Sequence, residues 1–323
     1  MNEWRPSASY EVLRQRAELL DCIRTFFAER QIVEVDTPIL SAYSSTDPHL
    51  DSFSTLSCKP GASLGSPMYL QTSPEFAMKR LLASGSGPIY QICKAFRYGE
   101  VGRYHNPEFT MLEWYRPDFD YKRLMKEVDE LLRLVLKTSP AEFLSYASVF
   151  EQYLQIEPHS ASVDRLRACA AANRIVVSET LGEDHNAWSA LLWTHLIEAN
   201  LGDDGRPLFV FDYPVSQAML ARIRPGSPPI AERFEVYVKG VELANGFQEL
   251  QDSVELQHRF EVDCRQRREG GMCEVNMDHR LLEAQRHGLP WCSGVAMGLD
   301  RLLMLKTGAG DLREILTFPF DRA

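Results

Sequence analysis

The stretch from Phe96 to Tyr115 most constrains what this chain can fold into and do. Its pattern predicts two extended segments around a loop, with basic and aromatic side chains close together. Arg97, Arg103 and His105 are suited to phosphate oxygens, because a guanidinium group makes charge-assisted and often bidentate bonds to phosphate. Phe109 offers a flat apolar face to a purine. The stretch therefore contains the groups needed to hold a nucleoside triphosphate.

The same stretch also carries acceptors for an ammonium group or a hydroxyl, namely Glu108, Glu113 and Tyr115. Taken alone, a basic and aromatic hairpin is more often solvated surface above a core face. A second feature favours the functional interpretation. The segment Gly298–Leu302 follows an apolar run and opens an apolar helix that we expect to end near Gly308. A strand, a glycine and a helix with an early arginine predict a second corner that faces phosphates.

Three segments together resemble the class II aminoacyl-tRNA synthetases of the lysyl branch. Phe96-Arg97 with His105–Thr110 resembles their motif 2, Gly294–Arg301 resembles motif 3, and Glu29–Pro38 resembles motif 1. The resemblance implies an α+β protein with the class II synthetase catalytic fold, an antiparallel sheet flanked by helices. It also implies ATP and Mg²⁺ as cofactors.

A narrower resemblance is to the bacterial elongation factor P (R)-β-lysine ligases, a family of lysyl-tRNA synthetase paralogues. It rests on Gly102–Pro117, on Ala231–Leu250 and on the closing Asp321-Arg322-Ala323. It implies that ATP activates (R)-β-lysine as an acyl-adenylate, and that a lysine amine of elongation factor P accepts it.

Site residues follow from the resemblance, position by position. ATP is assigned to Arg97, Gly99, His105, Asn106, Phe109, Glu242, Leu243, Gly298 and Arg301. The amino-acid substrate is assigned to Ser73, Pro74, Glu75, Tyr115, Glu249 and Ala296, and the metal to Glu235 and Glu242. Arg97 and Arg301 are the catalytic pair. The first holds the α-phosphate and the substrate carboxylate, and the second holds outer phosphates and sandwiches the adenine with Phe109.

Two of the substrate assignments have alternatives. Thr72–Glu75 has the pattern of a helix start, so Glu75 could simply compensate the helix dipole instead of binding an amino group. Ala296 stands where the lysyl-tRNA synthetases carry glycine, and its methyl group could reshape the pocket toward a β-amino group. Such a change is worth on the order of one to a few kcal/mol.

An acidic hairpin is predicted near residue 240. Phe234, Val236 and Val238 alternate with polar residues, as in a half-buried strand. If Lys239-Gly240 is a two-residue turn, Tyr237 lies opposite Glu242 and Glu235 lies diagonally from it on one face. Two carboxylates on one face repel each other unless a cation separates them, and Mg²⁺ is the economical cation.

Glu249 has the opposite parity along that strand. It joins the acidic face only if a bulge or bend shifts the alternation, which we predict at Asn245-Gly246. Alternatively, all three acids lie on a solvated acidic face of the strand and bind no ligand.

One departure from the family pattern concerns nucleotide affinity. Gly99 stands where motif 2 places a glutamate that reads the adenine amino group, and Tyr98 replaces the usual asparagine. Glu100 could substitute only with a one-residue shift, which in a strand turns the side chain to the other face. A non-catalytic protein that binds an amino acid is therefore an alternative.

The length and net charge of the chain indicate which kind of molecule accepts the activated amino acid. The chain has 323 residues with 45% hydrophobic content, which predicts one main domain over 1–323 with a helical insertion around 139–207. Fewer than about forty residues precede Pro38, too few for an anticodon-binding domain. A net charge of -10 also argues against stable nucleic-acid binding. A protein acceptor is favoured, and a shortened synthetase that charges tRNA is the alternative.

The remaining expectations concern scaffold and location. Ser9 caps a helix with Leu13, Leu20, Ile23 and Phe27 on one face, and in the family this region forms a homodimer interface. A second helix ends near Lys137, with a core stripe at Leu124, Val128, Leu131 and Val135. Seven cysteines without a CxxC pair indicate reduced thiols. With no signal peptide and no long apolar run, we expect a cytoplasmic protein without membrane contact.

Overall fold

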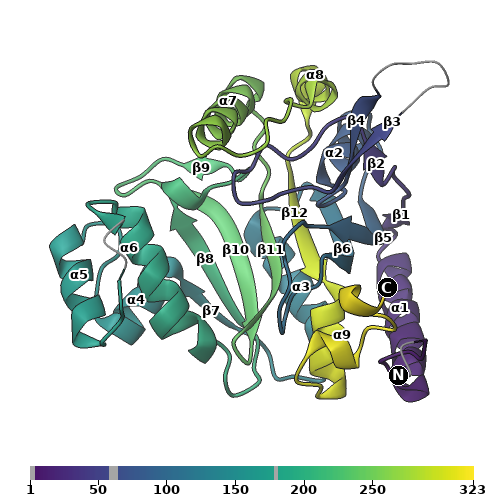
Figure 1. Ribbon diagram of the computed structural model, residues 1–323, viewed down its shortest axis with the longest axis horizontal. Coiled ribbons are helices and arrows are strands. Elements are labelled where there is room, and N and C mark those ends of the chain that lie inside the picture. Colours follow the sequence, from purple (N-terminus) through teal and green to yellow (C-terminus); the bar gives the residue numbers. More distant parts are fainter. Residues whose placement is uncertain (1–3, 58–64, 178–180) are drawn as a thin grey trace. The chain divides into compact units, whose positions relative to one another are not determined.

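The computed structural model describes residues 4–57, 65–177 and 181–323 (Figure 1). Its internal contacts divide the chain into two compact units. The first comprises Met1–Asp120 and Leu250–Ala323, and the second comprises Tyr121–Glu249. Helices and mostly antiparallel strands make both units, so the predicted α+β class is confirmed. No helix in the described ranges is long and apolar enough to cross a bilayer.

The first unit is built around four strands in the order β1 (Val33–Glu34), β5 (Ile89–Phe96), β6 (Glu108–Pro117) and β12 (Cys292–Gly298). The pair β1 and β5 is parallel, while β5, β6 and β12 are antiparallel. A small separate sheet has the order β2 (Leu40–Ser41), β4 (Ser66–Leu70) and β3 (Ser54–Ser57). The two extended segments predicted around the loop after Phe96 are thus β5 and β6.

Helices surround these strands. The first unit contains α1 (Tyr10–Glu29), α2 (Glu75–Ala83), α7 (Ser253–Glu269), α8 (His279–Gly288) and α9 (Leu299–Thr307), with 3₁₀ turns at Leu312–Glu314 and Phe320–Arg322. The predicted cap of α1 is confirmed, because the Val12 amide donates to Ser9 Oγ at 3.3 Å. In α1 the buried residues are Leu19, Ile23, Phe26 and Phe27, while Leu13 and Leu20 are only half-buried.

The two faces of β6 have different surroundings. Leu112 and Trp114 are fully buried, and the Phe27 ring of α1 packs against Trp114 with 5.4 Å between ring centroids. On the opposite face, β6 carries Phe109, Glu113 and Tyr115, because side chains alternate along a strand. One face of the strand is therefore core, and the other carries most of the predicted site residues of this segment.

The second unit contains strands in the order β11 (Val241–Gln248), β10 (Ile230–Val238), β8 (Leu208–Pro214) and β7 (Glu142–Ser145), with β9 (Ile223–Arg224) paired to β10. Helix α3 (Tyr121–Leu136) packs against β10 and β11. Its predicted stripe is confirmed, since Leu124, Val128, Leu131 and Val135 are all at most 2% exposed.

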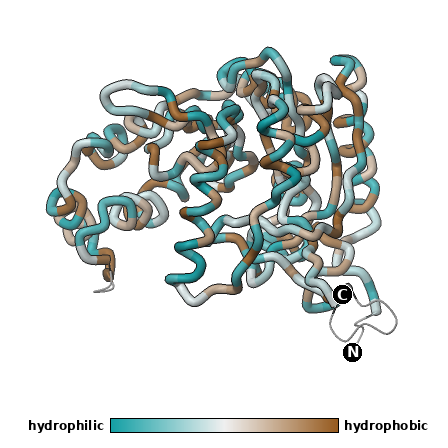
Figure 2. Tube along the Cα trace, turned by 90° about the horizontal axis from the view of Figure 1, so that it is seen from above, coloured by the Kyte–Doolittle hydropathy of each residue, from teal (hydrophilic) through white to brown (hydrophobic). Residues whose placement is uncertain are grey.

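The remaining helices of the second unit fall between β7 and β8, and one follows β8. They are α4 (Tyr146–Leu154), α5 (Val163–Ala172), α6 (His185–Leu192), the π-helix η2 (Trp193–Ile197) and the 3₁₀ turns η3 (Glu198–Asn200) and η4 (Val215–Gln217). Figure 1 shows α4, α5 and α6 gathered beside β7 and β8. Hydrophilic and hydrophobic positions alternate along the helical turns in Figure 2, as expected for amphipathic helices that cover a sheet.

The acidic hairpin has the predicted turn. Lys239 and Gly240 both have positive φ, 52° and 69°, and Tyr237 pairs with Glu242. The predicted position of the bulge is wrong. Asn245 and Gly246 pair regularly with β10, and the extra residue is Leu243, between Glu242 and Ala244. A bulge beside a tight turn takes up the strong local twist there, and it shifts the parity that brings Glu249 to the face of Glu242.

Candidate active site

The loop between β5 and β6 begins with Arg97. Its guanidinium carbon lies 5.1 Å from the centroid of the Phe109 ring, and its Nη1 lies 3.7 Å from Glu100 Oε1. Arg97 Nε is buried and makes no hydrogen bond within the described part of the chain. The structure therefore brings together a cation and an aromatic face, the two groups expected to meet phosphate and purine.

Arg301 and His105 form the second part of this group. Arg301 Nη2 lies 2.8 Å from His105 Nε2, and Arg301 Nε donates to the Tyr104 carbonyl at 3.0 Å. Desolvation of the ring, and then the charge of Arg301, lower the pKa of His105 below its usual value. A neutral His105 can accept the Arg301 hydrogen bond on Nε2, so the two side chains hold each other in place.

Gly298 lies at the N-cap of α9, where its neighbour across the turn is Arg301. A Cβ atom built at Gly298 would lie 3.7 Å from Arg301 Cδ, an ordinary contact. Glycine thus leaves the space beside the Arg301 side chain open.

The C-terminal segment of the chain contacts the loop that carries these residues. Arg103 Nε donates to the Gly310 carbonyl at 2.5 Å. Asn106 Nδ2 donates to the Glu108 carbonyl at 2.6 Å, and Asn106 Oδ1 accepts from the Phe320 amide at 3.0 Å. Asn106 therefore shapes the loop through both ends of its amide, and its contact with ATP stays a prediction.

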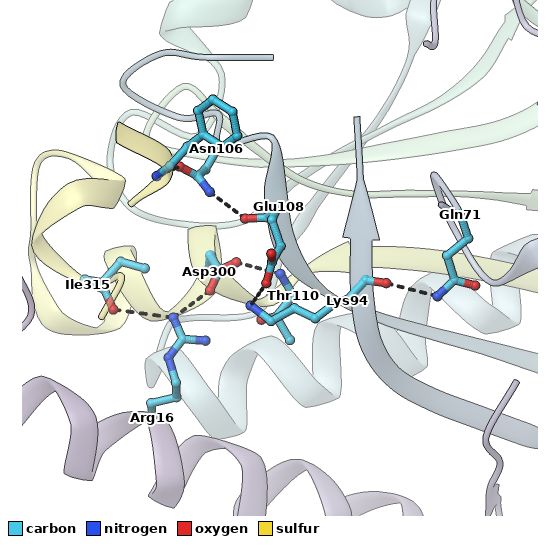
Figure 3. A network of polar contacts seen from close by, with 9 residues as sticks. Arg16, Gln71, Lys94, Asn106, Glu108, Thr110, Asp300 and Ile315 are labelled. Atoms are coloured by element: carbon cyan, nitrogen blue, oxygen red, sulfur yellow. Dashed lines mark hydrogen bonds and ion pairs between the residues drawn. The ribbon is translucent and has the colours of Figure 1, made fainter. Parts of the chain in front are cut away.

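A buried carboxylate next to Arg301 was missed by the sequence reasoning. Asp300 is 2% exposed, and its oxygens accept from Arg16 Nη2 at 2.6 Å and from the Thr110 amide at 2.7 Å. Arg16 also reaches the Ile315 carbonyl at 3.5 Å. Figure 3 shows these contacts linking α1, β6 and the start of α9. The signal in the sequence was an acid directly before the motif 3 arginine.

The face of β6 that carries Phe109 also carries a buried carboxylate. Glu113 is 2% exposed and accepts from Tyr115 Oη at 2.6 Å. It pairs with Gln91 on β5 and with Ala296 on β12, which places the three in one row across the sheet. Glu113 was not among the residues assigned to the substrate, although it was noted as an acceptor. A buried carboxylate of this kind is suited to an ammonium group.

Cys93 on β5 pairs with Met111, which is two residues from Glu113 along β6, so Cys93 and Glu113 share a face of the sheet. Burial, and then the charge of Glu113, raise the pKa of the Cys93 thiol to about 12. Such a thiol stays protonated near neutral pH and is a poor nucleophile. The six cysteines in the described ranges are free, as predicted, and Cys58 lies outside those ranges.

The three substrate assignments at the start of α2 lie together. Pro74 is the N-cap residue, and the Glu75 amide donates to Ser73 Oγ at 3.2 Å. Glu75 Oε1 lies 2.6 Å from Lys79 Nζ, whose side chain is 4% exposed. Glu75 therefore has a cationic partner in its own helix, and both roles considered for it stay open.

In the second unit, Glu235 lies in a buried polar cluster. Its Oε2 accepts from Tyr213 Oη at 2.6 Å and from Tyr237 Oη at 2.5 Å, and its Oε1 pairs with Arg233. Burial, and then the Glu235 charge, raise the pKa values of Tyr213 and Tyr237 well above the usual range. Three donors thus occupy three of the about four lone-pair positions of a carboxylate, and one position on Oε1 is left.

The other two acids lie on β11. Glu242 is half-buried opposite Tyr237, and Leu243, assigned to ATP, is the buried bulge residue. Glu249 is fully buried and bridges to Ala221. Among the residues that the structure describes, no group of three or more His, Cys, Asp or Glu could hold a metal. Mg²⁺ needs only one or two carboxylates besides phosphates and water, so the metal site on Glu235 and Glu242 stays a prediction.

Gly99 has a structural reason to be glycine. Its φ is +82°, in the left-handed region that side-chain-bearing residues rarely adopt, and it lies beyond the end of β5. The objection that a strand shift would turn Glu100 away does not apply here, because Glu100 is outside the strand and approaches Arg97.

The family follows from comparison with known proteins. The family model described as tRNA synthetases class II (D, K and N) matches residues 2–322. The chain belongs to this family of class II tRNA synthetases.

The similar curated proteins are more specific. The chain is 50% identical over 320 residues to proteins named elongation factor P--(R)-beta-lysine ligase from Salmonella arizonae, Salmonella paratyphi A and Salmonella schwarzengrund. Each match covers 99% of this chain and 98% of the relative.

Proposed function

We propose that this protein is an ATP-dependent ligase that activates (R)-β-lysine and attaches it to a lysine side chain of elongation factor P. The observation that carries the proposal is the match, over nearly the whole length of both chains, to relatives of that name. The site geometry supports the activation step, because Arg97 lies beside the Phe109 ring and Arg301 lies beside His105, as expected of groups that would bind phosphate and purine.

The proposed reaction has two steps. A carboxylate oxygen of (R)-β-lysine attacks the α-phosphorus of ATP, the bond to the β-phosphate breaks, and pyrophosphate leaves. The acceptor amine then attacks the acyl carbon, loses a proton and displaces AMP. Positioning and charge stabilisation carry such chemistry, so no covalent protein nucleophile is needed.

Residues of the first unit have these proposed roles. Arg97 holds the α-phosphate and the substrate carboxylate, where negative charge develops. His105 and Arg301 hold the outer phosphates, and Arg301 and Phe109 sandwich the adenine. Ser73, Pro74, Glu75, Tyr115 and Ala296 are proposed to surround the amino acid. The buried Glu113 joins them, because its carboxylate is already oriented by Tyr115.

Glu249 is proposed to bind the amino acid as well, and Glu235 and Glu242 are proposed to hold Mg²⁺. Bound there, Mg²⁺ would neutralise phosphate charge. We further propose a cytoplasmic homodimer without stable nucleic-acid binding.

Intact-mass measurement of the acceptor tests this function. Purified protein is incubated with Mg-ATP, elongation factor P and either (R)-β-lysine or α-lysine. We expect the mass to rise by one β-lysyl unit, and much faster than with α-lysine. An unchanged acceptor, together with aminoacylation of tRNA in a parallel reaction, would replace the proposal by a tRNA-charging enzyme. No reaction and no pyrophosphate exchange would indicate a binding protein.

A further inference from the structure

Side chains from two strands bond to the buried carboxylate of Glu235. Tyr213 is on β8, and Arg233, Glu235 and Tyr237 are on β10. Arg233 also bonds to Asn245 Oδ1 at 3.2 Å and to the Gln217 carbonyl at 2.9 Å. The position of the Glu235 carboxylate is thus set by where two tyrosine hydroxyls and one guanidinium point. Anything that fixes the tyrosine rings fixes Glu235.

Aromatic residues of the helical insertion pack on those two rings. Tyr146 of α4 lies 5.1 Å from Tyr213 between ring centroids. Trp193 lies 6.2 Å from Tyr213 and 6.1 Å from Tyr237. Trp193 itself stacks on Tyr146 at 5.1 Å with 13° between the ring planes. One tryptophan therefore contacts both tyrosines that donate to Glu235.

Trp193 lies where the helix changes from α to π geometry. It is the first residue of the π-helix Trp193–Ile197, which directly follows α6. A π-turn has one more residue than an α-turn and changes the direction in which the following side chains point, and such turns are frequent at functional sites. The sequence of this segment has the pattern of an ordinary amphipathic helix and gives no sign of the π-helix.

The end of the insertion also binds the hairpin turn between the acids. The Lys239 amide donates to the Gly202 carbonyl at 2.7 Å, and the Gly240 amide donates to the Leu201 carbonyl at 2.8 Å. The backbones are so close that a Cβ atom on Gly240 would lie 2.7 Å from the Ala199 carbonyl oxygen. The insertion is therefore attached to the β10–β11 hairpin at its turn as well as along its face.

From these contacts we infer that the helical insertion positions the metal-binding acid Glu235, with Trp193 as the positioning residue. The inference rests on the proposed function for its metal. Trp193 and Tyr146 hold Tyr213 and Tyr237 so that both hydroxyls bond to Oε2, and Arg233 bonds to Oε1. The remaining lone-pair position on Oε1 is then held in one direction, ready for a divalent cation.

The test compares two tryptophans of the same insertion. In Trp193→Phe, the ring that touches both tyrosines becomes smaller. Trp188→Phe is the matched control, since Trp188 belongs to the same insertion and is even more buried than the half-buried Trp193, but it packs against Arg167 and donates to the Gly182 carbonyl. The dissociation constant of Mn²⁺ is measured by electron paramagnetic resonance with a non-hydrolysable ATP analogue, beside thermal unfolding of each variant.

We expect Trp193→Phe to weaken Mn²⁺ binding about three-fold, in line with the loss of aromatic contacts, and Trp188→Phe to leave it unchanged. Tyr237→Phe removes one hydroxyl donor and should weaken it roughly ten-fold, which tests the cluster even if Trp193→Phe does not fold. Equal shifts in both tryptophan variants, or unaltered binding in Tyr237→Phe, would overturn the inference.

Pyrophosphate exchange by the unmodified protein distinguishes a failure of the proposed ligase function from a failure of the positioning role of Trp193. If exchange is absent but Mn²⁺ binding depends on Trp193, the positioning role stands and the proposed function fails. If exchange is present and the Mn²⁺ dissociation constant is unchanged in Trp193→Phe, only the positioning role fails.

Discussion

The two groups of predicted site residues differ in how their charges are held. In the first unit, Arg97 is at the start of a loop, its side chain is 28% exposed, and its ion partner Glu100 is 3.7 Å away. In the second unit, Glu235 is 10% exposed and three side chains bond to it. Arg97 Nε therefore has bonding capacity left for a ligand, whereas Glu235 has only one lone-pair position left, on Oε1. Because Glu235 is held by three donors and Arg97 by one distant partner, removal of a partner should cost more stability at Glu235.

The largest expected effect comes from removing the cation of the buried cluster. Arg233→Met leaves Glu235 charged and buried without its partner, so the free energy of unfolding should fall by roughly 3–5 kcal/mol. Urea unfolding measures it. The matched control is Arg24→Met, which breaks the exposed pair with Glu34 and should cost about 0–1 kcal/mol. Similar losses in both variants would remove the contrast between buried and exposed charges.

A smaller effect is expected at Asp300, a buried carboxylate of the first unit. Asp300→Asn keeps the shape but weakens the bonds from Arg16 and Thr110, and it should cost about 1–3 kcal/mol of unfolding free energy. Because Arg301 is the next residue, KM for ATP should rise more than kcat falls. The reverse pattern would mean that Asp300 does not position Arg301.

Gly99 tests the conformation of the loop. Gly99→Glu restores the family's residue type at a φ of +82°, and it should cost roughly 1–2 kcal/mol because the left-handed region is strained for side-chain-bearing residues. Gly99→Asn should cost less, since asparagine tolerates this region better. Thermal unfolding of the two variants compares them. Tighter ATP binding in Gly99→Glu without loss of stability would show that the missing glutamate, and not the backbone, matters here.

The smallest effect concerns the protonation of His105. Its pKa is lowered in the folded protein, so the neutral form is favoured by folding. The hydrogen bond from Arg301 is therefore present above the ordinary pKa of about 6.5 and is lost as pH falls through the lowered value. KM for ATP should rise over this acidic range. His105→Asn should abolish that pH dependence, and a profile unchanged by the substitution would contradict the role of His105.

The strands and the helix that carry the first group were predictable from the sequence, because they lie in continuous motifs. The hairpin β5–β6, the glycine before α9 and the helix of Arg301 all follow from local patterns, and the family is confirmed. Register within a local hairpin was also predictable, as the pairing of Tyr237 with Glu242 shows. The roles of the individual site residues stay predictions.

Contacts between distant segments could not be predicted from local patterns. Asp300 bonds to Arg16, 284 positions away in the sequence, and no periodicity indicates that pair. We predicted the bulge at Asn245-Gly246 from the parity of Glu249 alone, yet the extra residue is Leu243, beside the turn. The donors on Glu235 were missed as well, because one of them, Tyr213, is on another strand.

ATP–pyrophosphate exchange with (R)-β-lysine, in the unmodified protein and in Arg97→Ala, tests the central claim most directly. The protein should catalyse exchange, and Arg97→Ala should lower its rate by about 10²–10³, as expected when a donor to developing charge is lost. Exchange that continues at the original rate in Arg97→Ala would contradict the account.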